Sequence, residues 1–490
     1  TVGLRTRLET VVSASTRLEV VTEGVLVRII QHDQALEGYG TVIFDEFHER
    51  NLAGDLALAF THDCRQTLRP DLALLFMSAT VRSTELAPVL GDVPRIVVTG
   101  RTFPVTVEYH PPLPNEKPWE GAARLVRKAL GLADTGDILV FLPGYREITR
   151  ARELLEKDLP GNCAILALHG SLPPSEQRRA FQPVKNVRRI ILSTNIAETS
   201  VTIPGITVVV DTGLERRVRF SPRTGMDHWD TGAISAASAE QRKGRAGRLG
   251  PGICLRWWRE DAPLLPHSQP EILEADLAPL ALETAAWGAK TAEDLAWLTP
   301  PPQAHLRRAL ALLADLGLVE GNEAISPQGR AAAALGLHPR LARMVLRAAR
   351  EGDVATAALV AALIEEGGGI ARGAVDFRDR FEQWIAWSRG VPGDSSIAVN
   401  RVRDEAARCA RAAGSSFNAK DVDPSIAGRL LLLAYPDRAA KRSGVQGNRT
   451  RWTLAGGRAA FSSVPFSGCE YIVAPEIDGG DTDGRIMLAA

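Results

Sequence analysis

Two adjacent carboxylates, Asp45 and Glu46, stand directly after the apolar run Thr41–Phe44. A buried parallel strand that ends in this way places its acids at the sheet edge where α/β proteins bind ligands. Adjacent carboxylates can divide the work of nucleoside triphosphate hydrolysis, because one can hold Mg²⁺ and the other can activate the attacking water. We therefore predict that Asp45 binds Mg²⁺ through water and that Glu46 activates the nucleophile. An acidic pair that merely caps the following helix is the alternative.

A histidine and two hydroxyl groups accompany these acids. His48 lies two residues after Glu46, and Ser78 and Thr80 follow the next apolar run, Leu72–Met77. We predict that the hydroxyl groups bond to His48 and so link the nucleotide site to movement of the surrounding lobes. A Ser-x-Thr turn by itself is also a common helix cap.

A second group of functional residues lies in the segment Gln241-Arg-Lys-Gly-Arg-Ala-Gly-Arg248. Arg245 and Arg248 are three residues apart, so on a helical turn they face one side, while the two glycines permit close backbone approach. Two guanidinium groups aimed at one place stabilise the negative charge that develops on a transferred γ-phosphate. A solvated basic helix is the alternative, and Gln241 and the glycines argue against it.

Hydroxyl and amide side chains are concentrated in Ser193–Ile203, after another apolar run. Such groups suit phosphate oxygens and sugars, which need donors and no particular base edge. A capped loop between a strand and a helix is the alternative.

The elements that must position these residues follow from the apolar pattern. Short runs alternate with helical stretches as far as about residue 255, which predicts parallel sheets of β-α-β units. Core strands are expected at Thr41–Phe44, Leu72–Met77, Ile96–Val98, Val105–Tyr109, Asp137–Phe141, Ala164–Leu168, Arg189–Ser193 and Thr207–Val210. Two clusters of polar motifs suggest two lobes, divided near Gly100–Pro104. Helices are expected after Trp258, among them His305–Val319 and Leu341–Ala349, and short strands from Trp452 onward.

The composition limits the partners and the compartment. Lys+Arg and Asp+Glu both number 58, so any nucleic-acid surface must be a local channel and not a global basic charge. The five cysteines stand far apart without a C-x-x-C pair, which predicts a reduced, cytoplasmic protein. No apolar run reaches the roughly 18 residues of a membrane span.

Taken in order, these segments resemble the helicases of superfamily 2, and specifically their DEAH/RHA group. The matching segments are Gly3–Glu9 and Thr22–Arg28, which are similar to nucleic-acid-contacting segments, Asp45–His48 (motif II), Ser78–Thr80 (motif III), Ile138–Gly144 (motif IV), Ser193–Ile203 (motif V) and Gln241–Arg248 (motif VI). The variant Asp-Glu-Phe-His, with Phe47 where Ala is usual, looks most like the HrpB-type bacterial helicases.

The resemblance implies an α/β fold with two RecA-like parallel-sheet lobes, followed by helical domains and a small β-domain. The expected domains are the remainder of the first lobe (1–102), the second lobe (103–259), a winged-helix-like domain (260–330), a helical bundle (331–414) and a C-terminal β-rich domain (415–490). It also implies an ATP-dependent helicase that uses ATP and Mg²⁺ and binds single-stranded or duplex nucleic acid, with RNA favoured. A DNA translocase of the same superfamily and a non-catalytic nucleic-acid-binding derivative are the alternatives.

The resemblance also distributes roles among residues. It gives catalytic roles to Asp45, Glu46, His48, Gln241, Arg245 and Arg248, and places Phe181 beside the nucleotide base and Thr202 at the nucleotide. It places Arg7, Thr22, Gly24, Thr194 and Thr199 at the nucleic-acid backbone, and it implies that a hairpin at Arg216–Met226 parts the duplex. From the residues alone, Phe181 is equally well a core side chain that anchors a helix end beside Pro183.

One motif of the group has no counterpart. The phosphate-binding loop G-x-x-x-x-G-K-[ST] supplies the lysine and the hydroxyl that hold phosphate and Mg²⁺. No Gly-Lys dipeptide occurs among the 490 residues. We expect that this loop precedes Thr1 in a longer chain, and the group usually continues beyond residue 490 as well.

Overall fold

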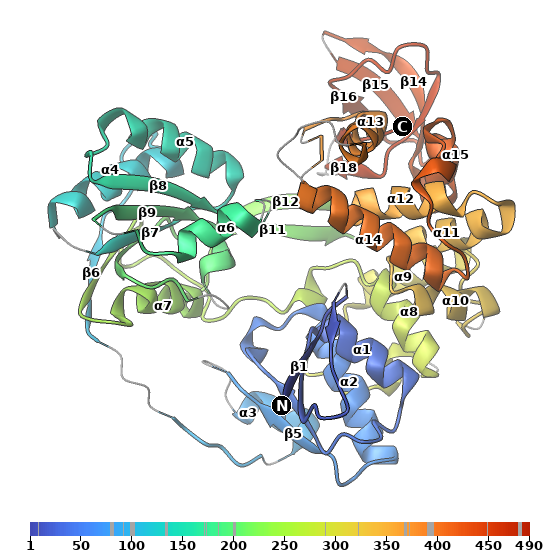
Figure 1. The fold of residues 1–490 in the computed structure, drawn as a ribbon, viewed down its shortest axis with the longest axis horizontal. Helices are drawn as coiled ribbons and strands as arrows, with labels where there is room; N and C mark the ends of the chain where they lie inside the picture. The colour runs from blue at the N-terminus through green and yellow to red at the C-terminus, as the bar shows by residue number, and fades with distance from the viewer. Residues whose placement is uncertain are drawn as a thin grey trace.

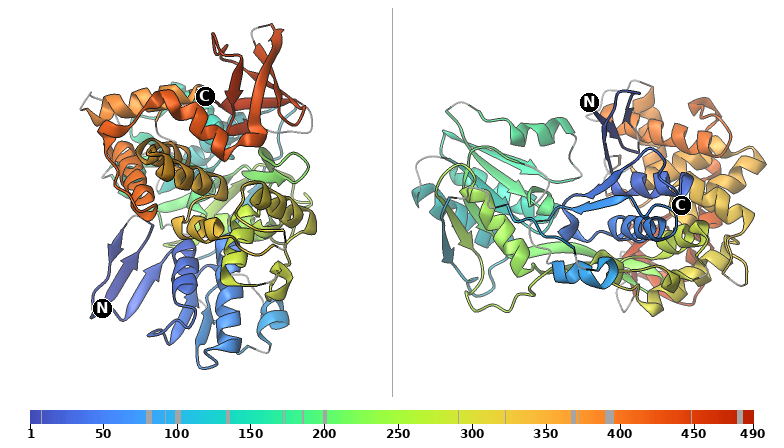
Figure 2. Two further views of the ribbon diagram at one scale, coloured as in Figure 1. Left: turned by 90° about the vertical axis from the view of Figure 1, so that its right-hand side faces the viewer. Right: turned by 90° about the horizontal axis from the view of Figure 1, so that it is seen from below.

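The computed structural model has three parts (Figure 1): a first lobe at the bottom of the view, a second lobe above it to the left, and a helical region on the right that carries the C-terminal β-sheet at its top. The structure describes residues 1–490 except residues 8, 79–82, 92, 99–102, 133–135, 171, 173, 185, 199–201, 290, 322, 367–369, 372, 390–395, 448 and 479–482. Figure 2 shows that the first lobe and the C-terminal sheet lie at opposite ends of the molecule.

The first lobe contains a short parallel sheet and a separate small one. The elements are β1 (Val2–Arg5), β2 (Thr10–Val11), β3 (Leu18–Val21), α1 (Glu23–His32), β4 (Thr41–Phe44), α2 (Leu52–Thr67), β5 (Ala73–Phe76) and α3 (Ser83–Leu90). β4 pairs in parallel with β5, and β1 pairs with both β2 and β3. One face of the β4–β5 pair is buried through Val42 and Phe44, whereas Ile43 is 42% and Leu75 44% exposed on the other. Parallel strands are normally covered on both faces, so the exposed face of the β4–β5 pair departs from the usual pattern.

The second lobe is a six-stranded parallel sheet in the order β6-β13-β10-β7-β9-β8. Its elements are β6 (Val105–Tyr109), α4 (Pro118–Leu132), β7 (Asp137–Phe141), α5 (Tyr145–Leu155), β8 (Cys163–Leu168), α6 (Pro174–Phe181), β9 (Arg188–Ser193), β10 (Ile206–Asp211), α7 (Ala236–Gly244) and β13 (Gly252–Arg256). α4 and α5 cover one face, and α6 and α7 lie on the other (Figure 1). All of β7 is buried, as a central parallel strand requires.

A long hairpin links the second lobe to the C-terminal region. β11 (Leu214–Ser221) and β12 (Met226–Ala233) pair in antiparallel register and cross to the other side of the molecule (Figure 1). At the tip, Met226 is buried in the core of the C-terminal sheet, and Arg438 Nη2 donates to the Gly225 carbonyl oxygen at 3.0 Å. The tip is therefore anchored, while Trp229 in β12 remains 54% exposed.

The remainder of the chain forms helices and then a rolled sheet. The helices are α8 (Ala278–Trp287), α9 (Gln303–Asp315), α10 (Pro327–Leu335), α11 (Pro339–Glu351), α12 (Val354–Glu365), α13 (Phe377–Ser388), α14 (Ser396–Ala412) and α15 (Ala427–Ala434). The strands β14 (Ala439–Gln446), β15 (Arg449–Leu454), β16 (Ala459–Ser462), β17 (Tyr471–Val473), β18 (Glu476–Asp478) and β19 (Gly484–Leu488) form one sheet in the order β17-β14-β15-β16-β19-β18. Among the described residues, no helix combines the length and apolar character that crossing a bilayer demands.

Most of the expected core strands are confirmed, and one is wrong. Ile96–Val98 forms no strand; Ile96 and Val98 are each 85% exposed, since no neighbouring strand pairs with them. The sequence reading missed β13, which follows the glycines of Gln241–Arg248 and completes the second sheet. The predicted α/β class, with helices and a small sheet after the lobes, is confirmed.

Candidate functional site

The acidic pair follows β4 and is held by the end of β5. Phe47 N donates to the Met77 carbonyl oxygen at 3.1 Å, and Met77 N donates to the Phe44 carbonyl oxygen at 2.8 Å. Glu46 has φ 48°, in the left-handed region that residues other than glycine rarely adopt. The strand end is therefore a sharp, fixed turn that presents Asp45 and Glu46.

Asp45 fits a magnesium site of the kind that is built mainly from water and phosphate. Its carboxylate is exposed, and Oδ1 accepts from Glu46 N at 2.8 Å. Within the described part of the chain, no three His, Cys, Asp or Glu side chains gather into a metal-binding group. Mg²⁺ is usually held through one or two carboxylates together with waters and substrate phosphates, so a single exposed aspartate suits it.

A polar contact joins the two lobes through His48. Gln241 Nε2 lies 2.6 Å from His48 Nε2, and His48 Nδ1 lies 3.5 Å from Glu46 Oε2. The Gln241 amide can donate to His48 Nε2, whereas His48 Nδ1 is buried without a hydrogen-bond partner among the described residues and meets Glu46 only in the longer polar contact. Ser78, one of the partners expected for His48, is exposed after β5, and Thr80 lies outside the described residues. The residue that is hydrogen-bonded to His48, Gln241, belongs to the other lobe.

The two arginines of the second lobe have different surroundings. Arg245 is buried and its Nε donates to the Glu198 carbonyl oxygen at 2.9 Å, whereas Arg248 is exposed and its Nη1 donates to Thr202 Oγ1 at 2.7 Å. Burial and the neighbouring Arg248 lower the pKa of Arg245 to about 10, while Glu198 and Glu46 act in the opposite direction. Arg245 therefore stays protonated at neutral pH and lies within the field of Glu46.

Arg242, which the sequence reading did not single out, supports this segment. It is fully buried; its Nε donates to Glu198 Oε2 at 2.8 Å and its Nη1 to Asp211 Oδ1 at 2.9 Å. Its guanidinium also lies 4.7 Å from the centre of the Phe141 ring. Removing one partner of such a buried pair typically costs about 3–5 kcal/mol. Arg242 thus ties the start of the arginine segment to β7 and β10.

Four of the residues predicted to meet nucleic acid are described. Thr22 and Gly24 line a cavity of about 510 Å³ beside α8 and α11, together with Arg7 and Arg28. Thr194 directly follows β9 in the second lobe. Thr199 lies outside the described residues. The first-lobe members thus share one cavity with a second arginine, Arg28, that sequence reasoning missed.

Arg7 already has partners from the helical region. Its Nε donates to Glu405 Oε2 at 3.1 Å, and its Nη2 forms ion pairs with Glu365 and Glu405. Glu405 also accepts from Arg408. A phosphate must therefore compete with two carboxylates for Arg7. Arg7 and Glu405 are 398 positions apart, so no local sequence pattern predicts their contact.

Glu283, which lines the same cavity, makes the stability of the folded chain depend on pH. Burial raises its pKa to about 7, although Gln31 Nε2 donates to Oε2 at 3.0 Å and Arg28 lies nearby. Because the folded state holds this proton more tightly than the unfolded state, stability falls as the pH rises from about 4.5 through 7. The full shift corresponds to roughly 3 kcal/mol.

We expect Glu283→Gln to raise the melting temperature by a few degrees at pH 8 and to change it little at pH 5. Thermal unfolding should therefore show a smaller decrease in melting temperature between pH 5 and pH 8 for the variant than for the unaltered chain. Glu320→Gln, at an exposed position in the same helical region, is the control and should leave the slope unchanged. Equal slopes for Glu283→Gln and the unaltered chain would show that Glu283 ionises normally.

The position of Phe181 agrees with both interpretations, a ring that stacks on the nucleotide base and a core side chain that anchors a helix end. It is the last residue of α6 and is partly exposed, and it packs against the second-lobe core. A ring in this position can anchor the helix end and still present one edge or face to a ligand.

The comparisons with known proteins agree with this arrangement. Residues 121–250 match the helicase conserved C-terminal domain family. The chain is 40% identical to the ATP-dependent RNA helicase HrpB of Escherichia coli over its whole length, which covers 58% of that protein. It is 37% identical to the ATP-dependent RNA helicase HrpA of E. coli, over 73% of this chain and 28% of that one. A crystal structure of the E. coli DEAH/RHA helicase HrpB superposes with a TM-score of 0.86 at 39% identity, covering all of this chain and 60% of the other. The chain therefore spans somewhat over half the length of HrpB.

Proposed function

The chain belongs to the DEAH/RHA helicase group, and from this premise we propose that it couples ATP hydrolysis between its two lobes to movement along RNA and to unwinding. The domain limits near residues 102, 259, 330 and 414 are part of this proposal. So is a cytoplasmic location, which is supported by five cysteines that are all free.

The observation that carries the proposal is the Glu46–His48–Gln241 chain of polar contacts between the lobes, in which Gln241 is hydrogen-bonded to His48 and Glu46 Oε2 lies 3.5 Å from the same imidazole. It joins the residue that we assign to water activation with the arginine-bearing segment of the other lobe. A change in the distance between the lobes must therefore alter the surroundings of Glu46. This is the physical requirement for coupling hydrolysis to movement.

The roles of the residues follow from their positions. Asp45 would hold Mg²⁺, which neutralises phosphate charge when bound, and Glu46 would accept the proton of the attacking water. Arg248 is exposed and would approach the γ-phosphate, with Thr202 fixing its side chain. Arg245, which is buried and charged, would add positive potential behind it. Gln241 and His48 would transmit the state of the site between the lobes.

We propose that Arg7, Thr22, Gly24, Thr194 and Thr199 bind the sugar-phosphate backbone of a single strand, and that the strand is RNA. Such contacts carry no base information, so binding should be salt-dependent and nearly indifferent to sequence. The test compares RNA and DNA oligonucleotides of several sequences by fluorescence anisotropy across a salt titration. A strong preference for one sequence that persists at high salt would contradict the assignment. Tighter binding and faster unwinding of DNA would favour a DNA translocase.

Stacking of Phe181 on the base predicts weak discrimination among nucleotides, because every base has a π-face. In a chain that carries a phosphate-binding loop, GTP, CTP and UTP should be hydrolysed within about tenfold of ATP, a spread of roughly 1.4 kcal/mol. Phe181→Ala should raise KM for all four nucleotides together, by a stacking contact of about 1–3 kcal/mol. If Phe181→Ala lowers the melting temperature without changing KM, the ring is a core residue and the base is read elsewhere.

A further inference from the structure

Arg7 and two carboxylates form a contact between the first lobe and the helical region. Arg7 follows β1, whereas Glu365 is the last residue of α12 and Glu405 lies in α14. Arg7 Nε donates to Glu405 Oε2 at 3.1 Å, and its Nη2 donates to Glu365 Oε2 and to Glu405 Oε1. The carboxylate oxygens thus occupy the donor positions of the guanidinium that the oxygens of a phosphate group would take.

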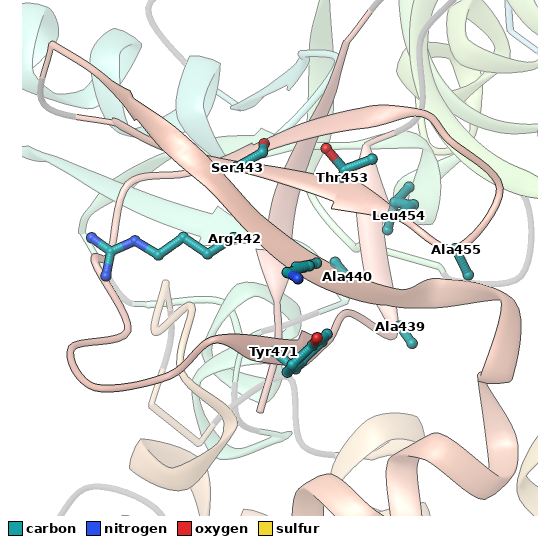
Figure 3. A pocket seen from close by; sticks show the side chains of 9 residues that line it. Ala439, Ala440, Arg442, Ser443, Thr453, Leu454, Ala455 and Tyr471 are labelled. Carbon is teal, nitrogen blue, oxygen red and sulfur yellow. The ribbon is translucent and has the colours of Figure 1, made fainter.

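This contact is more enclosed than an ordinary surface ion pair. The side chains of Arg7, Glu365 and Glu405 are 29%, 17% and 0% exposed. By contrast, Lys441 lies beside a groove on the C-terminal sheet (Figure 3) and pairs with Glu470 at 3.4 Å, and both side chains are more than half exposed. Water screens an exposed pair of that kind, whereas a partly buried pair is screened much less. Arg7 is therefore firmly held by its carboxylates.

The two carboxylates differ in the partners that remain when Arg7 leaves. Glu405 keeps Arg408, whose Nε donates to Oε2 at 2.9 Å and whose Nη2 donates to Oε1 at 2.6 Å, and it accepts from Cys409 Sγ at 3.3 Å. Among the described residues, Glu365 has no ion-pair partner besides Arg7, and it is partly exposed. Water can solvate Glu365 while Arg408 satisfies Glu405, so no buried charge is left unpaired. The structure therefore allows Arg7 to be released at low cost.

The held arginine lies at a cavity that is itself positively charged. Arg7 lines the cavity of about 510 Å³ together with Thr22 and Arg28. Burial and the positive charges of Arg408 and Arg7 lower the pKa of Arg28, so the three guanidinium groups lie within one another's field. Glu405 binds two of the three. A phosphate that enters the cavity is attracted by these charges but finds Arg7 already occupied.

Given the proposed contact of Arg7 with RNA, on which this inference rests, we propose that Glu365 and Glu405 form an autoinhibitory latch on Arg7. The latch holds Arg7 while no RNA is bound, and a backbone phosphate releases it. Arg7 then passes from Glu365 to the phosphate, Glu405 keeps Arg408, and the first lobe loses a tie to α12. RNA and the carboxylates compete for one guanidinium, so weakening the latch strengthens RNA binding.

The test measures binding of a fluorescein-labelled oligouridylate of about 12 nucleotides to the 490-residue chain, without ATP and at low salt. Glu365→Gln keeps the shape of the side chain, removes its charge and should tighten binding about fivefold or more. The matched control is Glu366→Gln. Glu366 is the next residue, is 16% exposed and pairs with Arg401, so the control removes an equal charge that does not hold Arg7. Equal effects of the two variants would reflect net charge alone and would overturn the proposal.

A double-mutant cycle with Arg7 separates the latch from any other role of Glu365. In the Arg7→Ala background, Glu365→Gln should have no larger effect than Glu366→Gln, because the latch then has no cation to release. Tightening by Glu365→Gln that persists without Arg7 would overturn the proposal. So would weaker RNA binding together with a lower melting temperature for Glu365→Gln alone, since the contact would then serve only to hold the domains together.

The Arg7→Ala variant also distinguishes failure of the latch from failure of the RNA contact. If this variant binds RNA as tightly as the unaltered chain, Arg7 does not meet RNA and both assignments are wrong. If it binds about fivefold or more weakly while Glu365→Gln behaves like Glu366→Gln, Arg7 does bind RNA and only the latch is wrong. The expected result is weaker binding for Arg7→Ala and tighter binding for Glu365→Gln.

Discussion

Glu46→Gln should lower kcat for ATP on the order of 10³-fold in a chain that carries a phosphate-binding loop, with little change in ATP affinity. The amide cannot accept the proton of the attacking water, yet it has nearly the same shape and still lies beside His48. Steady-state hydrolysis in the presence of RNA gives kcat, and a fluorescent ATP analogue gives the affinity.

Glu49→Gln is the matched control for this substitution. Glu49 is exposed, three residues further along the same turn, and outside the Glu46–His48–Gln241 chain, so the control should keep nearly full turnover. The 490-residue chain itself contains no Gly-Lys dipeptide, and we expect it to hydrolyse ATP near background. Robust hydrolysis by the Glu46→Gln variant would show that another group activates the water. Robust hydrolysis by the 490-residue chain would show that it needs no such loop.

Arg248→Ala should lower kcat on the order of 10³-fold or more and leave RNA affinity within a few-fold. Arginines that reach a transferred γ-phosphate contribute effects of this size, because they stabilise charge that appears only in the transition state. The structure leaves Arg248 exposed, with its guanidinium aligned by Thr202 Oγ1. Arg248→Lys should recover only a part of the activity, since an ammonium group lacks the planar fork of donors.

Lys243→Ala is the control for Arg248→Ala. Lys243 lies five residues earlier on the same segment and pairs with Glu240. Its loss should leave kcat within a few-fold. If Arg248→Ala instead abolishes RNA binding while kcat at saturating RNA holds, this arginine belongs to the nucleic-acid channel.

The sequence predicted the strand ends well because the signal there is local. A short apolar run that stops at Asp-Glu, as at Asp45 and Glu46, needs no distant partner to be recognised. The same holds for one of the two glycines of Gln241–Arg248: a Cβ on Gly247 would lie 2.7 Å from the Phe103 carbonyl oxygen, so close backbone approach is required there, whereas a Cβ on Gly244 would meet nothing within 4 Å.

The partners of these residues could not be predicted, because they come from distant parts of the chain. His48 meets Gln241 across 193 positions, and Arg7 meets Glu405 across 398. Only the packing of one domain on another brings these groups together. The strand expected at Ile96–Val98 failed for the same reason, since an apolar run becomes a strand only where a neighbouring strand can pair with it.

The anchored hairpin tip limits how the second lobe can travel. A body attached to its neighbour at a distant point loses free translation there and is left mainly with rotation about that point. Arg438, bonded to Gly225, together with the buried Met226 marks such a pivot. If the lobes open at the contact between His48 and Gln241, the displacement there would be larger than at the hairpin tip, because the tip lies close to the axis of rotation. The second lobe would thus act as a lever, with its largest displacement at the nucleotide and its smallest at the C-terminal sheet.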